Sequence, residues 1–238
     1  MSQALHISQR GGPPPTEKSQ VQEPDRQNKQ SLPPMKSQDY SELEDWPGYF
    51  ESVLGKGARE TLLAAMDSFL REGFDEGLGV DIAAGEGRDT LELLRQGWRV
   101  VATDNHPAAF PLLWSRVPET SKSRLTAVEV DFAEMEVPDC DLVNASFALP
   151  FCKPEHFPGL WSRIVAAIRP GGRFAGQFFG DRDTWASLPG RTHHSRNQVE
   201  ELLTGFEIEM MDEEERDDPP DIRSPKHWQM FHVVAKKL

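Results

Sequence analysis

The spacing of apolar and polar positions changes several times along the chain. Residues 57–72 repeat apolar side chains at helical spacing, with Glu and Arg on the other side, which predicts a helix. A short apolar run at 77–83 predicts a strand, residues 88–97 predict a helix that ends at a glycine, and residues 98–104 predict a second strand. Because crossovers between such strands are right-handed, this region predicts a parallel βαβ unit.

The alternation of strands and helices continues to the end of the chain. The last two predicted strands have no helix between them, so they are expected to pair as an antiparallel hairpin at one edge. We therefore predict an α/β fold with a doubly wound, mostly parallel seven-stranded sheet that ends in this hairpin. The pattern predicts further helices at 107–117, 154–172 and 196–205, and further strands at 125–131, 140–148, 173–180, 206–214 and 227–237.

Composition sets the first 40 residues apart from the rest. They contain six prolines and seven glutamines and show no apolar period. Such a segment buries too little apolar surface to offset the entropy of ordering. We expect a disordered Pro/Gln-rich tail at 1–40 and a folded domain at 41–238.

Charge narrows the range of partners. The 238 residues carry a net charge of −13, while the first 40 hold five basic and four acidic residues, so the negative charge belongs to the domain. An acidic surface without a basic patch repels phosphate backbones, and no nucleic-acid partner is expected. We interpret the acidic run at 212–218 as a solvated loop between the last two strands.

The two cysteines and the lack of long apolar runs bear on location. Cys140 and Cys152 do not have the spacing of a zinc site or a disulfide framework, which favours a reducing compartment and no metal. No apolar run approaches the roughly 20 residues of a membrane span, and the N-terminal segment lacks the apolar block of a signal peptide. We expect a cytoplasmic protein without a membrane partner.

A turn of small residues follows the first predicted strand. Asp81, Ala83, Gly85 and Gly87 form a D-x-A-x-G-x-G pattern between that strand and a helix. Small residues let the backbone turn sharply and approach a ligand, and the start of the helix offers unpaired N–H groups. The pattern alone is also typical of an ordinary tight turn.

Carboxylates at the ends of the next two strands point to a nucleoside. Asp104 ends the second strand, where an acidic side chain reaches the ribose of a nucleoside that lies across the sheet. Asp131 ends the third strand and is followed by Phe132, so a carboxylate and an aromatic ring are available to adenine. Three successive strand ends therefore predict one nucleoside pocket.

The glycine spacing separates two candidate nucleoside cofactors. A dinucleotide fingerprint requires a third glycine at the position of Thr90. Asp81 instead suits a ligand with an aliphatic amino group, which S-adenosylmethionine has and NAD lacks. We therefore predict S-adenosyl-L-methionine as the cofactor.

These residues carry a resemblance to a known family. The run VDIAAGEGRDTLELLRQGWRVVATDNHPAA at 80–109, RPGGRFAGQFF at 169–179 and the terminal hairpin resemble the class I S-adenosylmethionine-dependent methyltransferases over residues 46–238. The run from Gly85 to Leu91 is most similar to the tellurite-resistance-type small-molecule methyltransferases and their uncharacterised bacterial relatives. Ala83 stands where the family usually has a glycine.

The resemblance implies a role for each matching position. It places the D-x-A-x-G-x-G residues around the methionine end of the cofactor, Asp104 on the ribose, and Asn105, Asp131 and Phe132 at the adenine. Arg88 has two interpretations: it reaches the methionine carboxylate, or it is an exposed residue of the first helical turn. The expected cofactor-binding residues are Asp81, Ala83, Gly85, Gly87, Arg88, Asp104, Asn105, Asp131, Phe132 and Asn144.

Candidate substrate residues lie in loops after the strands, because ligands enter open α/β sheets there. His193 has three interpretations: a general base, a metal ligand together with His194, or a neighbour of a helix cap. The run from Asn144 to Phe147 lacks the two prolines of the N-P-P-[YF] motif, so methylation of nucleobases or protein amides is not expected. The expected substrate-binding residues are Trp46, Tyr49 and Phe50 as a lid, with Phe147, Arg182, Trp185 and His193; Phe151, Asp183 and Arg191 are further candidates.

These features predict an enzyme that transfers a methyl group to a small-molecule acceptor by in-line displacement. A soft nucleophile such as a thiol or a metalloid oxyanion needs positioning more than a strong base. A monomer or weak homodimer is expected. Two alternatives remain: a protein methyltransferase whose tail docks its target, and a non-catalytic module that binds S-adenosylmethionine.

Overall fold

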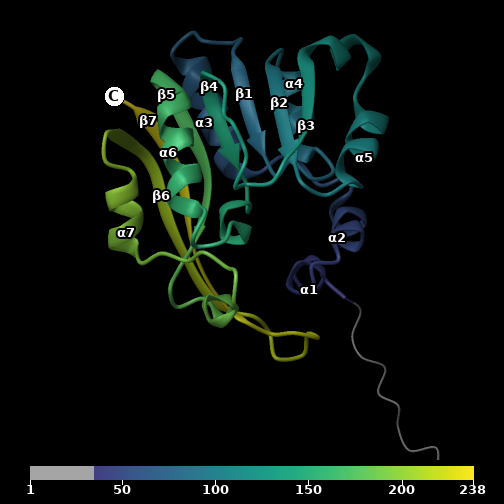
Figure 1. Ribbon diagram of the computed structural model, residues 1–238, viewed down its shortest axis with the longest axis vertical. Coiled ribbons are helices and arrows are strands. Elements are labelled where there is room, and N and C mark those ends of the chain that lie inside the picture. The colour runs from purple at the N-terminus through teal and green to yellow at the C-terminus, as the bar shows by residue number, and fades with distance from the viewer. Residues whose placement is uncertain (1–34) are drawn as a thin grey trace, which may run out of the picture. The chain divides into compact units, whose positions relative to one another are not determined.

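A seven-stranded sheet organises residues 35–238, the part of the chain that the computed structural model describes (Figure 1). The strands lie in the order β3-β2-β1-β4-β5-β7-β6. The first five are parallel, and β7 pairs antiparallel with both β5 and β6. This confirms the predicted mostly parallel sheet with an antiparallel end. The strands are β1 (Leu78–Ile82), β2 (Arg99–Asp104), β3 (Leu125–Glu129), β4 (Cys140–Ala145), β5 (Ile168–Phe179), β6 (Phe206–Asp217) and β7 (His227–Lys237).

Helices cover both faces of the sheet, as the doubly wound prediction requires. Leu62 of α3, Leu93 of α4 and Leu113 of α5 belong to one buried cluster, whereas Leu160 of α6 and Val199 of α7 belong to the cluster on the other face. No helix within residues 35–238 is long and apolar enough to cross a membrane. The helices are α1 (Ser37–Glu42), α2 (Trp46–Val53), α3 (Glu60–Arg71), α4 (Arg88–Arg95), α5 (Ala109–Arg116), α6 (Phe157–Ala167) and α7 (Arg196–Leu202), with short 3₁₀ turns η1 (Glu119–Arg124), η2 (Leu149–Phe151) and η3 (Thr184–Ser187).

Two short helices precede the predicted elements. The side chain of Asp45 caps α2 by accepting the Gly48 N–H at 3.1 Å, and Pro47 occupies the first turn of that helix. Residues 37–40, which we expected in the tail, begin α1, and Asp39 there is buried. The rest of the expected tail lies outside the described residues.

The helix predicted at 154–172 is shorter than expected. Helix α6 ends at Ala167, and Ile168 already begins β5. Pro170 explains the difference, because the residue before a proline avoids the helical conformation and adopts an extended one.

The acidic run at 212–218 is not the loop that we expected. Most of it belongs to β6, which extends to Asp217 along the edge of the sheet. Charged side chains are compatible with an edge strand because they discourage pairing with another chain. Neighbouring side chains also pair with them: Glu214 lies 3.1 Å from the His232 ring on β7, and Glu215 lies 2.6 Å from the guanidinium of Arg182, in the loop after β5.

Candidate functional site

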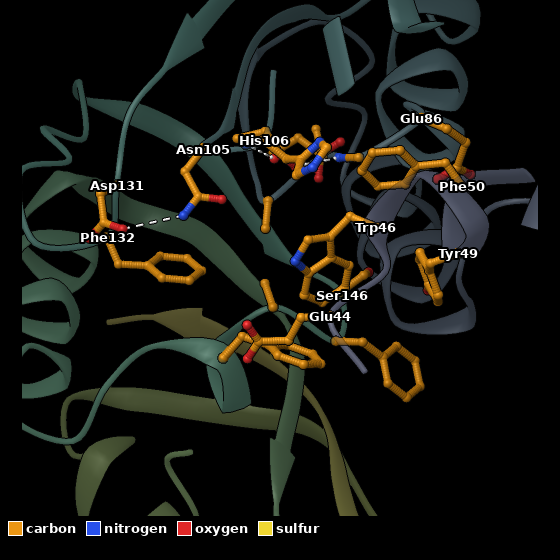
Figure 2. Close-up of a pocket in the computed structure, with 18 of the residues that line it drawn as sticks. Glu44, Trp46, Tyr49, Phe50, Glu86, Asn105, His106, Asp131, Phe132 and Ser146 are labelled. Atoms are coloured by element: carbon orange, nitrogen blue, oxygen red, sulfur yellow. Dashed lines mark hydrogen bonds between the residues drawn. The ribbon is translucent and has the colours of Figure 1, made fainter. Parts of the chain in front are cut away.

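A cavity of about 400 Å³ opens at the carboxyl ends of β1, β2 and β4, with α2 beside it. In Figure 2, Asn105, Asp131 and Phe132 lie at one end, Tyr49 and Phe50 lie at the other, and Trp46 lies between. The cavity brings together most of the residues singled out by the sequence. Those that line it are Trp46, Tyr49, Phe50, Asp81, Ala83, Gly85, Arg88, Asp104, Asn105, Asp131, Phe132, Phe147, Phe151 and Arg191.

The turn after β1 needs its glycines. Gly85 has φ +55° and Gly87 has φ +85°, a left-handed conformation that side chains disfavour. A Cβ at Gly85 would lie 3.0 Å from the Phe50 ring, and a Cβ at Gly87 would overlap Leu113. Gly87 does not line the cavity; it precedes α4 as its N-cap and directs the helix N-terminus.

Ala83 has φ +54°, so the residue that replaces the usual glycine is strained. We expect Ala83→Gly to raise the free energy of unfolding by about 1 kcal/mol, because relief of this strain exceeds the entropy that glycine adds to the unfolded chain. Urea denaturation measures the change. Ala84→Gly is the control: Ala84 is buried beside it without a left-handed φ, and its substitution is expected to destabilise the protein.

Asp104 holds the cavity wall with both carboxylate oxygens. Its Oδ2 accepts the Gly85 N–H at 2.9 Å and its Oδ1 accepts the His106 N–H at 2.8 Å. Burial raises the pKa of Asp104, and the backbone N–H donors oppose that rise. Each oxygen has a second lone pair, so the carboxylate can also accept hydrogen bonds from a vicinal diol.

At the far end of the cavity, Asp131 is fixed by two donors. Its Oδ2 accepts the Asn105 amide at 3.2 Å (Figure 2) and its Oδ1 accepts the Ala133 N–H at 3.0 Å. The Ala133 N–H lowers the pKa of Asp131, so the carboxylate is ionised at neutral pH. Phe132 adds an aromatic ring beside this polar group.

Two buried carboxylates share one amide under the glycine-rich turn. The Asn144 amide donates to Asp81 Oδ1 at 2.8 Å and to Asp89 Oδ2 at 3.1 Å, while the Thr90 hydroxyl donates to Asp81 Oδ2 at 2.5 Å. Burial, followed by the nearby Asp89 carboxylate, raises the pKa of Asp81 to about 7. Asn144 does not line the cavity and acts by positioning these carboxylates. Asp89 was not predicted from the sequence, because an acidic residue in the first turn of a helix is common.

Two arginines approach the same region. Arg88 donates from Nε and Nη2 to the Gly57 carbonyl. Within the described part of the chain, its buried Nη1 has no hydrogen-bond partner. Burial and the neighbouring Arg59 lower the pKa of Arg88. The Arg59 guanidinium lies 4.2 Å from the Phe147 ring centroid and donates to the Tyr49 hydroxyl at 3.2 Å. Arg59 was missed because nothing in its local sequence distinguishes it from other polar residues at a helix start.

Arg182, Trp185 and His193 do not line the cavity, although the sequence placed them among the substrate residues. The loop after β5 folds back on β7, where Arg182 N–H donates to the Gln229 side chain at 2.8 Å. Arg182 is exposed and forms its ion pairs with β6, and Trp185 is buried against Trp228. Both ring nitrogens of His193 are buried and have no hydrogen-bond partner in the region that the structure describes, and burial lowers the pKa of His193.

Part of the chain matches a known family of protein domains. Residues 80–172 match the family model of the methyltransferase domain. A carboxy-S-adenosyl-L-methionine synthase of Vibrio parahaemolyticus is 32% identical over 97 residues, which cover 39% of this chain and 40% of that protein. An uncharacterized methyltransferase of Synechocystis is 31% identical over 96 residues, which cover 40% of this chain and 44% of that protein. The matched region thus spans less than half of these curated relatives.

The strand order is that of the class I methyltransferase fold, and residues 80–172 match a methyltransferase domain. Within that class, the chain is similar to TehB from Haemophilus influenzae, with a TM-score of 0.65 and 15% identity over 81% of this chain and 67% of that chain. It is also similar to a TehB-like methyltransferase from Corynebacterium glutamicum, with a TM-score of 0.56 and 16% identity over 83% of this chain and 99% of that chain. At these identities the likeness is one of fold.

Proposed function

We propose that the protein is an S-adenosyl-L-methionine-dependent methyltransferase that acts on a small molecule. The observation that carries the proposal is the arrangement of Asp81, Asp104 and Asp131, which lie at or near the carboxyl ends of three neighbouring strands and line one cavity. Donors and acceptors that suit each part of the cofactor follow one another along that cavity. The cavity volume of about 400 Å³ lies in the range of small-molecule sites, about 300–1,000 Å³.

The residues present fit the cofactor on their own chemistry. Asp104 retains lone pairs for the ribose hydroxyls, and Asp131 with Phe132 offers an acceptor and a ring to adenine. The unpartnered Nη1 of Arg88 suits the methionine carboxylate. Asp81 provides negative charge for the amino group. When bound, the cofactor supplies an electrophilic methyl group.

Substrate features follow from the rest of the cavity. The aromatic residues Trp46, Tyr49 and Phe50 on α2 exclude water, and positioning is the main requirement of a displacement by a soft nucleophile. The chemistry that we propose therefore allows a thiol or a metalloid oxyanion as the nucleophile that accepts the methyl group. The thiols of Cys140 and Cys152 are buried and unpaired, which supports a reducing, cytoplasmic setting.

Calorimetric titration with S-adenosylmethionine, S-adenosylhomocysteine and NADH tests the proposal. Both adenosyl ligands are expected to bind with a stoichiometry of one, and NADH is expected not to bind. Release of S-adenosylhomocysteine during turnover then separates an enzyme from a non-catalytic module. Binding of NADH in place of the adenosyl ligands would contradict the proposed cofactor.

The raised pKa of Asp81 predicts a pH dependence of cofactor binding. A positively charged amino group near Asp81 favours the ionised carboxylate, so S-adenosylhomocysteine is expected to bind more tightly as the pH rises through about 7. Below that pH, where the carboxyl group is protonated, binding is expected to release the Asp81 proton. Calorimetry in buffers with different ionisation enthalpies measures that proton. Asp81→Asn is expected to bind more weakly and to release fewer protons. Equal proton release by the variant would assign the effect to another group.

A further inference from the structure

One part of the cavity, which we call the acceptor half, joins flat aromatic rings to a buried cation. It consists of Trp46, Phe147, Phe151 and Arg191. The rings of Trp46 and Phe151 meet edge to face with centroids 5.0 Å apart, and the Arg191 guanidinium lies 4.5 Å from the Phe151 ring centroid. Aromatic faces and a guanidinium together suit a flat, anionic molecule.

Arg191 is incompletely paired for a buried charge. Its side chain is only 8% exposed, and its ion-pair partner is Glu44, with Nη2 and Oε1 3.1 Å apart. The Arg191 Nε is buried without a hydrogen-bond partner among residues 35–238. A guanidinium is best satisfied by a carboxylate that bridges two of its N–H donors, so Glu44 leaves part of this capacity unused.

Glu44 is a replaceable partner. Its side chain is 61% exposed, and it lies in the turn between α1 and α2 with φ +56°, a conformation that costs energy for a residue with a side chain. Figure 2 shows Glu44 beside Trp46 at the cavity. Because an exposed carboxylate in a strained turn is held weakly, a ligand can take its place on Arg191.

We propose that the methyl acceptor is a planar aromatic molecule that carries a carboxylate group and, on a separate atom, a soft nucleophile such as a thiolate, a substrate class that rests on the proposed methyltransferase function. That nucleophile forms the bond to the methyl carbon as the bond from this carbon to the sulfonium sulfur breaks, and S-adenosylhomocysteine is the leaving group. The carboxylate replaces Glu44 on Arg191, and the ring lies among Trp46, Phe147 and Phe151. Glu44 occupies the place of the acceptor's anionic group when no acceptor is bound.

This arrangement gives the two partners of one ion pair opposite effects on binding. Removing the charge of Glu44 removes a competitor and leaves Arg191 uncompensated, so an aromatic carboxylate binds more tightly. Removing the charge of Arg191 removes the binding group, so the same ligand binds more weakly. An ion pair that only stabilises the fold would give both substitutions the same sign.

The experiment is calorimetric titration of benzoate and benzamide into the 238-residue protein loaded with S-adenosylhomocysteine. Benzoate is expected to bind at least about tenfold more tightly than benzamide, a difference of about 1.4 kcal/mol. Glu44→Gln is expected to tighten benzoate binding about threefold, as removal of a weak surface ion pair should. Arg191→Gln is expected to abolish the preference for benzoate. Arg182→Gln is the matched control, because that arginine also pairs with carboxylates but lies outside the cavity.

Three results would overturn the inference: equal affinities for benzoate and benzamide, unchanged benzoate binding by Arg191→Gln, or weaker binding by Glu44→Gln. The comparison of the two ligands on the unmodified protein does not depend on how the variants fold. If S-adenosylhomocysteine fails to bind, the proposed function fails, and titration of the free protein with both ligands still decides whether this cavity selects an aromatic carboxylate.

Discussion

Replacing Asp104 with alanine is expected to weaken the binding of S-adenosylhomocysteine at least about 100-fold. The carboxylate is proposed to accept two hydroxyl donors, and hydrogen bonds to charged groups contribute about 1.5–3 kcal/mol each. Its oxygens also accept the Gly85 and His106 N–H groups, so the substitution leaves two backbone donors without their partner. Calorimetric titration measures the affinity, and thermal unfolding shows whether the variant remains folded.

A second variant separates the ligand from the loop. Asp104→Asn retains one acceptor oxygen but turns an amide toward the other backbone N–H, so we expect a binding loss smaller than that of alanine. Glu129→Ala is the matched control, because Glu129 is an exposed carboxylate at the end of the neighbouring strand and does not line the cavity. If Asp104→Ala folds and retains full affinity, Asp104 does not contribute to the binding of S-adenosylhomocysteine.

The parts of the site predicted from the sequence are those set by the βαβ unit. Asp81, Gly85 and Asp104 have fixed positions relative to a strand end and a turn, so their spacing in the chain determines their spacing in the cavity. Gly87 was predicted in the same way, although it does not line the cavity and instead forms the N-cap of α4.

Residues placed by long-range packing could not be predicted in this way. Trp185 lies in a loop after β5, but its indole is buried. The Nζ of Lys226 lies 3.7 Å from the indole ring centroid and forms a 2.7 Å ion pair with Asp183, which is 43 positions away in the chain. Arg59 and Glu44 reach the cavity because the segment before α3 packs beside the strand ends. Neither contact leaves a periodic signal in the sequence.

The extent of the last strands shows the same limit. Alternation predicted β6 and β7, but the acidic residues suggested that β6 would stop early. The strand continues to Asp217 because residues on its neighbours supply compensating cations, such as Arg182 from the loop after β5. Cation placement across strands is a tertiary property, so charge along the sequence alone pointed to a loop.

Replacing Arg173 with methionine is expected to lower the free energy of unfolding by about 2–3 kcal/mol. Arg173 begins the continuous part of β5 and its side chain is fully buried. Its guanidinium forms hydrogen bonds with Glu209 at 2.7 and 2.8 Å and with Glu72 at 2.7 and 3.2 Å. Breaking a buried pair typically costs about 3–5 kcal/mol, and partial exposure of both glutamates places this case at or below the lower end.

Arg169→Met is the control for this substitution. Arg169 also belongs to β5 and pairs with Asp141 at 3.0 Å, but half of its side chain is exposed, so a loss below about 1 kcal/mol is expected. Urea denaturation of both variants measures the difference. If both substitutions lower the free energy of unfolding equally, burial of the Arg173 guanidinium does not increase the contribution of its ion pairs to stability.

The same network predicts how stability depends on acid. Hydrogen bonds from Arg173 and Lys236 lower the pKa of Glu72 to about 2. The folded protein therefore binds fewer protons than the unfolded chain between the usual glutamate pKa and about 2, and stability is lost as the pH falls through that window. Arg173→Met removes the hydrogen bonds that lower the pKa of Glu72 most, so the stability of the variant should fall less steeply between pH 5 and pH 2 than that of the unmodified protein. If the free energy of unfolding of both proteins falls equally steeply with pH, the loss of stability in acid is due to other carboxylates. The low pKa of Glu72 would then not depend on Arg173.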